Sequence, residues 1–375
     1  MSETRRETPL ARKLKERIRR DGPISVREYM QSCLHDAEHG YYRKRPAIGA
    51  QGDFITAPEI SQVFGELIGI WCAVVWRAMA TPSQIQLVEL GPGRGTLMRD
   101  ALRAARVVPG FLGAASLHLV ESNAVLREMQ REALLDLELP MTWHQDAEWA
   151  LTCEQGIPRA PTIVIANEFL DALPIEQSVY EGGAWQTRVV TLDAHGELIF
   201  AAERNGSSGL QPPARFQPRE GDILESCPGG VDLGADLCAR ALHGPLATLF
   251  IDYGYVGLAP GDTLQAVVTH RHVSALAAPG ETDLTAHVDF DAFARAAEKA
   301  GLAVDGPITQ AEFLLIMGLV ERTEKLMASA PPGQIGLLEA GARRIADPMG
   351  MGGLFKVLCV RSKHVPLLPP FAPAG

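Results

Sequence analysis

The segment that most restricts the fold is an apolar run that leads directly into three glycines. Residues 85–90 have the short apolar pattern of a buried strand, and Gly91, Gly93 and Gly95 follow at alternate positions. Glycine permits sharp turns and lets a backbone approach a ligand closely. A helix is expected to continue to about Arg106, so its first N–H groups would face the turn. The pattern predicts a strand, a turn and a helix that together bind a nucleotide-like ligand.

Short apolar runs alternate with helical stretches after this unit. Such alternation is typical of a parallel sheet built from strand-helix-strand units, and so of an α/β fold. Between about residues 175 and 244 the rhythm breaks into alternating runs and a Gly/Pro/Ser-rich stretch, which predict an antiparallel β-rich insertion after the fourth strand. The expected strands of the main sheet are residues 85–90, 117–121, 141–143, 162–166 and 247–251, with later candidates at 302–304 and 355–360.

The chain is predicted to have four parts. Its 375 residues are enough for one large domain with additions, since a domain takes about 150 residues. Residues 1–80 are expected to form an N-terminal helical segment, and residues 81–175 and 246–364 the α/β core. Residues 176–245 are expected to form the insertion, and residues 365–375 a Pro-rich tail.

Composition and charge exclude several classes of protein. With 35 Lys and Arg against 45 Asp and Glu, the net charge of −10 gives no overall field that would attract nucleic acid or anionic lipid. The longest run without charged or obviously polar side chains, residues 67–76, is shorter than the ~20 residues of a membrane span. Scattered cysteines fit a reducing compartment, and the first twenty residues contain no convincing leader. We therefore expect a cytoplasmic protein.

Polar residues are expected at the carboxyl ends of the strands that follow the glycines. Glu121 closes the second strand, Asp146 follows the third and Asn167 closes the fourth. Open α/β sheets bind ligands outside these strand ends. A carboxylate at Glu121 could accept hydrogen bonds from both ribose hydroxyls, and Asp146 could accept one from an adenine amino group. Together with Glu89, these side chains indicate a nucleoside site, although a tight turn that binds no ligand is the alternative.

The spacing of the glycines separates two cofactor classes. Dinucleotide enzymes favour Gly-x-Gly-x-x-Gly. Here the pattern is Glu89-x-Gly91-x-Gly93-x-Gly95, which is typical of S-adenosylmethionine-dependent methyltransferases, whose donor has no pyrophosphate. The sequence thus favours S-adenosylmethionine over NAD.

Two acidic residues, Glu168 and Asp171, follow Asn167 on the side where methyltransferases hold their acceptor. Enzymes that methylate DNA or glutamine amides typically carry Asn/Asp-Pro-Pro-Tyr here, and this chain does not. Two carboxylates suit a cationic acceptor such as a guanidinium, which they can hold by bidentate hydrogen bonds. These residues could instead cap a following helix, and both roles could hold together.

Four segments closely resemble the MidA-like methyltransferases, namely residues 52–66, 89–98, 167–174 and 283–290. That family includes mitochondrial assembly factors of respiratory complex I that methylate a protein arginine. The resemblance extends from about residue 40 to residue 356. It implies a Rossmann-like class I methyltransferase core, S-adenosylmethionine as donor, and a protein substrate that presents an arginine, with a link to respiratory complex assembly.

The resemblance also implies roles for individual residues. The glycines would hold the methionine part of the donor, Glu121 the ribose and Asp146 the adenine end. We expect residues 52–59 to form a lid over the cofactor, because Thr56-x-x-Glu59 has the spacing of a helix capping box. The predicted cofactor-binding residues are Glu89, Gly91, Gly93, Gly95, Glu121, Asp146, Asn167, Gly52, Thr56 and Pro58. The predicted catalytic residues are Asn167, Glu168 and Asp171.

Two other functions and a metal site compete with this prediction. A cofactor-binding assembly chaperone would use the same pocket without turnover, and an NAD-dependent oxidoreductase would use it for a dinucleotide. The segment His35-x-x-Glu38-His39 matches the inverted zinc-protease pattern. Gly40 follows at once, where the helix of such a site must continue, so no metal is predicted.

Overall fold

The structure is a computed structural model that describes residues 7–44, 56–152, 155–207, 210, 212, 216–257, 260–268 and 271–371. The chain divides into two compact units. The core unit consists of Ile48–Leu170, Val231–Val256 and Phe290–Gly375, and the insertion unit of Met1–Ala47, Asp171–Gly230 and Gly257–Asp289. Each unit is therefore assembled from three separate stretches of the sequence.

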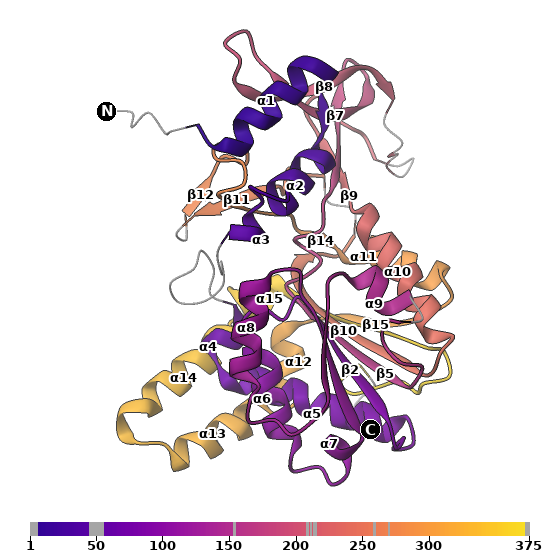
Figure 1. The fold of residues 1–375 in the computed structure, drawn as a ribbon, viewed down its shortest axis with the longest axis vertical. Coiled ribbons are helices and arrows are strands. Elements are labelled where there is room, and N and C mark those ends of the chain that lie inside the picture. The colour runs from indigo at the N-terminus through magenta and orange to yellow at the C-terminus, as the bar shows by residue number, and fades with distance from the viewer. Residues whose placement is uncertain are drawn as a thin grey trace. The chain divides into compact units, whose positions relative to one another are not determined.

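The core unit is built on a mixed sheet in the order β15-β16-β10-β5-β2-β3-β4. Neighbouring strands from β10 to β4 are parallel, and β16 and β15 add an antiparallel edge beside β10 (Figure 1). The predicted α/β architecture is therefore confirmed. The strands are β2 (Ile85–Leu90), β3 (Ala115–Val120), β4 (Met141–His144), β5 (Thr162–Asn167), β10 (Leu246–Tyr255), β15 (Ala303–Thr309) and β16 (Phe355–Arg361).

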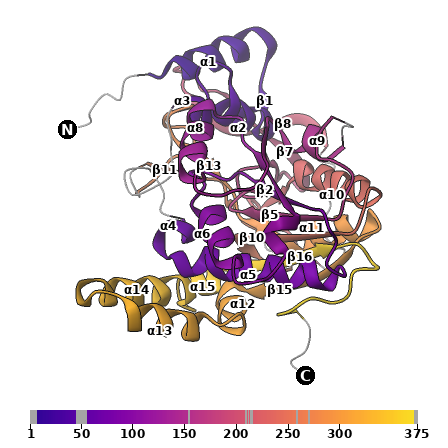
Figure 2. The same cartoon turned by 60° about the horizontal axis from the view of Figure 1, so that its bottom comes forward.

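Helices cover both faces of this sheet. On one face α5 and α6 pack against the strands, and on the other Phe293 of α11 meets Phe250 of β10 edge-on, with 4.7 Å between ring centroids. The helices α13 and α14 lie side by side (Figure 2). The helices that contribute to the core unit are α4 (Ala57–Ile60), α5 (Gln62–Ala78), α6 (Thr96–Ala105), α7 (Phe111–Ala114), α8 (Ala124–Ala133), α9 (Ala147–Thr152), α10 (Pro228–Ala241), α11 (Phe290–Lys299), α12 (Gln310–Ile316), α13 (Leu319–Ser329), α14 (Pro332–Ala346) and α15 (Met351–Leu354).

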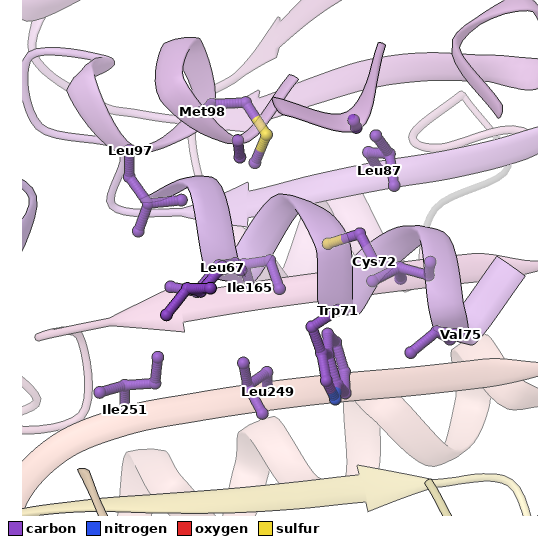
Figure 3. Close-up of a cluster of buried hydrophobic side chains, with 14 of the residues drawn as sticks. Leu67, Trp71, Cys72, Val75, Leu87, Leu97, Met98, Ile165, Leu249 and Ile251 are labelled. Carbon is purple, nitrogen blue, oxygen red and sulfur yellow. The ribbon is translucent and has the colours of Figure 1, made fainter. Parts of the chain in front are cut away.

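The main hydrophobic core lies between α5 and the sheet. Trp71 of α5 is fully buried and points toward Leu249 of β10 (Figure 3). Burying a large apolar side chain of this kind contributes about 1.5–3 kcal/mol, so the apolar stripe of α5 fixes this helix on the strands. Gly69 brings α5 against α6, because a Cβ atom there would lie 2.0 Å from the carbonyl oxygen of Ala101. This contact holds α6, and with it the end of the glycine turn, in place.

The insertion unit is built on an antiparallel sheet in the order β1-β7-β6-β9, with β8 paired to β7. A second antiparallel sheet has the order β12-β11-β13. Leu14 of α1 and Tyr29 of α2 are buried in one cluster with Val190 of β7, so the first helices and this sheet share a core. The elements are α1 (Pro9–Asp21), β1 (Ile24–Ser25), α2 (Val26–His35), α3 (Tyr41–Lys44), β6 (Glu176–Glu181), β7 (Ala184–Leu192), β8 (Leu198–Ser207), β9 (Ile223–Ser226), β11 (Gln265–Val268), β12 (Arg271–Val273), β13 (Asp283–Thr285) and β14 (Val288–Asp289).

Candidate active site

The three glycines form the turn between β2 and α6. Their φ angles are +67° at Gly91, +53° at Gly93 and +80° at Gly95, in the left-handed region that favours glycine. Space is limited as well, because a Cβ atom on Gly91 would lie 3.2 Å from a ring carbon of Phe169. The backbone N–H of Gly91 donates to the carbonyl of Val120 at 3.1 Å, which ties the turn to β3. Conformation and packing therefore both require glycine here.

Glu89 lies one residue before the end of β2 and is 3% exposed. Its Oε2 atom has no hydrogen-bond partner among the described residues. Burial raises the pKa of Glu89 to about 8, because the charged form loses its hydration. A buried acceptor of this kind favours a ligand that brings a donor or a positive charge.

A cavity at the glycine turn brings several of the predicted residues together. Its lining includes Glu89 of β2, Asn167 at the end of β5, and Thr56 and Pro58 at the start of α4. Gly91, Gly93 and Glu168 contribute to the same lining. Gly52 lies outside the described residues.

The predicted capping box at residues 56–59 is not formed, and this expectation was wrong. The Thr56 side chain makes no cap hydrogen bond, although α4 does begin at the next residue. Glu59 instead accepts a hydrogen bond from the Thr96 hydroxyl of α6 at 2.5 Å. Ser61 then interrupts the helix and caps α5 through the N–H of Val63. The Glu59 carboxylate thus ties α4 to the first turn of α6, beside the glycines.

Asn167 and Glu168 lead from β5 into the turn that follows. Glu168 has a φ of +52°, a conformation that costs a non-glycine residue about 1–3 kcal/mol. Its backbone N–H donates to the carbonyl of Ile251 on β10 at 2.8 Å. The Asn167 Nδ2 atom donates to Glu168 Oε1 at 3.2 Å, and Asn167 Oδ1 is buried without a partner in the described part of the chain. A strained residue beside an unsatisfied acceptor is typical of a functional position.

Asp171 belongs to the insertion unit and is buried there. Its carbonyl accepts a hydrogen bond from the N–H of Ala286 at 3.0 Å. Burial raises the pKa of Tyr42, and the nearby carboxylates of Asp283 and Asp171 raise it further. The alternative that Glu168 and Asp171 cap a following helix was wrong, because turns lead from residue 168 to β6.

Glu121 and Asp146 follow the neighbouring strands, as the sequence predicted. Glu121 Oε1 accepts a hydrogen bond from the backbone N–H of Asn123 at 2.7 Å, and the Glu121 backbone N–H donates to the carbonyl of His144. Asp146 is exposed, and its carboxylate accepts from the N–H of Trp149 at 2.7 Å in the first turn of α9. Both carboxylates are thus held by backbone N–H groups, and each keeps further acceptor capacity for a ligand.

Two residues to which sequence analysis gave no role shape this site. Asp252, buried at the carboxyl end of β10, accepts hydrogen bonds from the backbone of the turn after Glu168. Gln130 of α8 donates to the carbonyl of Gly93. The strand-end position of Asp252 was a signal for its role. No local pattern indicated Gln130, because one polar residue on an amphipathic helix carries no information about its contacts.

His35, the first residue of the pattern that resembles a zinc-protease motif, packs against an aromatic ring. The ring of His35 lies 5.7 Å from that of Tyr42 between centroids, and burial lowers the pKa of His35. Within the described ranges, no three His, Cys, Asp or Glu side chains are arranged to hold a metal ion. None of the helices described is both long enough and apolar enough to cross a membrane.

Comparison with known proteins identifies the family. A family model described as "Putative S-adenosyl-L-methionine-dependent methyltransferase" matches residues 67–308. The chain belongs to this methyltransferase family. It is 35% identical to the mitochondrial protein arginine methyltransferase NDUFAF7 homolog of Drosophila melanogaster, over 94% of this chain and 84% of that protein. It is 36% identical to the mitochondrial protein arginine methyltransferase NDUFAF7 of Danio rerio, over 90% of this chain and 83% of that protein.

A solved structure supports the same assignment. A protein from Burkholderia thailandensis, crystallised with S-adenosyl-homocysteine, has a TM-score of 0.82 and 26% identity over 97% of this chain and 95% of that chain. The protein is an S-adenosylmethionine-dependent methyltransferase with a Rossmann-like class I core, as predicted. Neither the NAD-dependent oxidoreductase nor the chaperone without turnover finds support in these comparisons.

The residues at the glycine turn fit this donor. S-adenosylmethionine carries an ammonium group and a sulfonium group, and the unsatisfied Glu89 oxygen is a buried acceptor beside the glycines. Positive groups stabilise a carboxylate that burial otherwise keeps protonated. The acceptor chemistry of this cavity therefore agrees with the charge of the donor.

The prediction of a cytoplasmic location was wrong. The curated relatives from Drosophila melanogaster, Danio rerio and Mus musculus are mitochondrial proteins. The prediction relied on the absence of a recognisable leader and on scattered cysteines. Neither feature determines location. Targeting signals are read by receptors, and the folded enzyme does not need these signals.

Proposed function

We propose that this methyltransferase methylates a guanidinium nitrogen of an arginine in a protein. The observation that carries the proposal is Glu168, a carboxylate held in a left-handed backbone conformation in the lining of the cavity at the glycine turn. Strain of this kind persists only where the surrounding structure enforces it. The names of the curated relatives, which are protein arginine methyltransferases, support the same acceptor.

The proposed donor site extends along the carboxyl ends of β2, β3 and β4. Gly91, Gly93 and Gly95 would hold the methionine part, with Glu89 as a buried acceptor behind them. Glu121 would accept hydrogen bonds from the ribose, and Asp146 would contact the adenine. Thr56 and Pro58 would cover the cofactor from the start of α4. When bound, S-adenosylmethionine supplies an electrophilic methyl group.

The proposed acceptor site uses the end of β5. The Glu168 carboxylate would bind the guanidinium through charge-assisted hydrogen bonds, and Asn167 Oδ1 would accept one further N–H. A guanidinium is a poor nucleophile because its charge is delocalised and its pKa exceeds about 12. A carboxylate bonded to one nitrogen draws positive charge toward that side, so the lone pair of another nitrogen becomes more available. The same carboxylate can take up the proton that the methylated nitrogen loses.

A transfer assay tests the acceptor. Purified protein is incubated with S-adenosylmethionine and with two peptides that differ only in arginine or lysine, and methylation is read by mass spectrometry. We expect methylation of the arginine peptide alone. Glu168→Gln should lower transfer by about 100-fold, as expected for a positioned carboxylate, while the calorimetric affinity for S-adenosylhomocysteine stays within about twofold.

Glu324→Gln serves as the matched control, because Glu324 is an exposed glutamate on α13. Its transfer rate should equal that of the wild type. Methylation of the lysine peptide would overturn the arginine assignment. Equal losses of transfer and donor affinity in the Glu168 variant would make this carboxylate a structural group.

A further inference from the structure

Gln130 is a fully buried glutamine on α8, and each polar position of its side-chain amide is used. The Nε2 atom donates to the carbonyl oxygen of Gly93 at 2.7 Å. The same nitrogen lies 3.5 Å from Oε2 of Glu121. The Oε1 atom accepts a hydrogen bond from the indole N–H of Trp143 on β4 at 2.9 Å. Because one amide meets three partners, its orientation is fixed.

Gln130 also supports the last glycine of the turn. A Cβ atom on Gly95 would lie 3.4 Å from the Cα atom of Gln130 and 3.5 Å from its Cγ atom. The helix backbone at Gln130 therefore packs directly beneath Gly95, while its amide holds the carbonyl of Gly93. One residue of α8 thus contacts two of the three glycines.

The carboxylate of Glu121 is held from two directions. Its Oε1 atom accepts from the N–H of Asn123, and its Oε2 atom faces the Gln130 amide. The Glu121 carbonyl accepts a hydrogen bond from Nε of Arg127 at 2.7 Å. Burial raises the pKa of Glu121, and the hydrogen bonds from Asn123 and Gln130 act in the opposite direction. The Gln130 amide therefore helps to set both the direction and the charge of this carboxylate.

We infer that Gln130 is a positioning residue that couples the glycine turn to Glu121, so that the methionine and ribose contacts of the donor depend on each other. The inference rests on the proposed donor site. With the amide in place, the Gly93 carbonyl and the Glu121 carboxylate keep a fixed separation. Without it, the turn and the carboxylate can each shift, and a ligand must order them on binding. The chemistry concerned is recognition of an adenosine that carries an amino-acid chain.

A thermodynamic cycle separates this role from simple packing. Wild type and Gln130→Met are each titrated with S-adenosylhomocysteine and with its analogue that lacks both ribose hydroxyls. We expect the substitution to weaken S-adenosylhomocysteine binding about tenfold, because hydrogen bonds to a charged group are lost. In each protein, the affinity lost when the two ribose hydroxyls are removed is the penalty of the analogue. We expect this penalty to be smaller in Gln130→Met than in wild type, because Glu121 is then no longer aligned with the hydroxyls. Coupled sites give such non-additive losses.

Gln310→Met is the matched control. Gln310 is also a fully buried glutamine of the core unit, and its amide donates to the carbonyl of Ile345 at 2.7 Å. This variant should lose less thermal stability than Gln130→Met, because it gives up one hydrogen bond and an oxygen that has no partner among the described residues. Its affinities for both ligands should stay at the wild-type values.

Each outcome decides the matter. If wild type fails to bind S-adenosylhomocysteine, the proposed donor site fails and the inference with it. If wild type binds but the analogue's penalty is identical in both proteins, only the inference fails. Should Gln130→Met not fold, Trp143→Phe frees the Oε1 atom while leaving the glutamine in place. That variant should lose affinity and ribose discrimination in the same direction by a smaller factor, and an unchanged discrimination would overturn the inference.

Discussion

The Oδ2 atom of Asp252 lies 2.9 Å from the backbone nitrogen of Leu170. The same oxygen accepts a second hydrogen bond from the N–H of Phe169 at 3.1 Å, and Oδ1 accepts from the N–H of Tyr253 at 2.9 Å. A buried carboxylate at the end of β10 therefore clamps the turn that follows β5. Because Glu168 stands immediately before this turn, the clamp helps to hold it in its strained conformation.

We predict that Asp252→Ala lowers the free energy of unfolding by about 3 kcal/mol, because buried N–H groups lose their acceptor. Asp252→Asn keeps one side-chain oxygen and should cost about half as much. In the asparagine variant, methyl transfer should fall more than donor affinity, since the turn that positions Glu168 is loosened. Urea unfolding, calorimetry and the peptide assay measure the three quantities.

Thr248→Val provides a control on the same strand. Thr248 is fully buried, and its hydroxyl has no partner among the described residues, so an isosteric apolar side chain should leave stability unchanged or raise it. If neither Asp252→Asn nor Thr248→Val lowers the free energy of unfolding, the hydrogen bonds that Asp252 accepts do not stabilise the protein.

A second prediction concerns the strain at Glu168. Glycine adopts a φ of +52° without steric cost, so Glu168→Gly should leave the free energy of unfolding unchanged or raise it by up to about 1 kcal/mol. Transfer should nevertheless fall as far as in Glu168→Gln, because the carboxylate is gone. Glu168→Ala keeps the strain and should be less stable than the glycine variant. The reverse order of stability would show that this backbone conformation is not strained.

The pKa of Glu89 makes a prediction about pH. Burial raises the pKa of Glu89 from 4.5 to about 8, so between these values the carboxyl is neutral in the folded protein and ionised in the unfolded chain. Unfolding then releases a proton, and stability must fall as pH rises through this window. Relative to Glu89→Gln, the free energy of unfolding of the wild type should fall by about 1 kcal/mol per pH unit between pH 5 and 8. Urea unfolding across this range checks the difference, and parallel curves for the two proteins would contradict it.

The last prediction concerns the glycine turn. Gly95→Ala places a side chain at a φ of +80° and against Gln130, so it should cost about 1–3 kcal/mol and weaken donor binding. Gly333→Ala is the comparison, because Gly333 lies in helix α14 and a Cβ atom there meets open space. That variant should be neutral or slightly stabilising and should bind the donor normally. Thermal unfolding and calorimetry distinguish the two, and equal effects would mean that left-handed geometry is unimportant here.

The features that were predicted correctly from the sequence depend on local patterns. The glycine turn follows from alternate glycines after an apolar strand, and Glu121 and Asn167 could be placed because strand ends of a parallel sheet meet along one edge. The capping box failed for a long-range reason, since Thr96 of α6 competes for the Glu59 carboxylate. The prediction of a cytoplasmic location was wrong because the fold of the chain does not determine where the protein is located.

By itself, the sequence determined the α/β architecture, the donor and the polar residues that stand at the strand ends, because periodicity and glycine spacing act within a few residues. Tertiary structure alone decided that the first helices share a core with β7, that Gln130 reaches two glycines and Glu121, and that Asp252 holds the turn after Glu168. These contacts join residues far apart in the chain. Their formation depends on the packing of whole helices and strands, which no local pattern records.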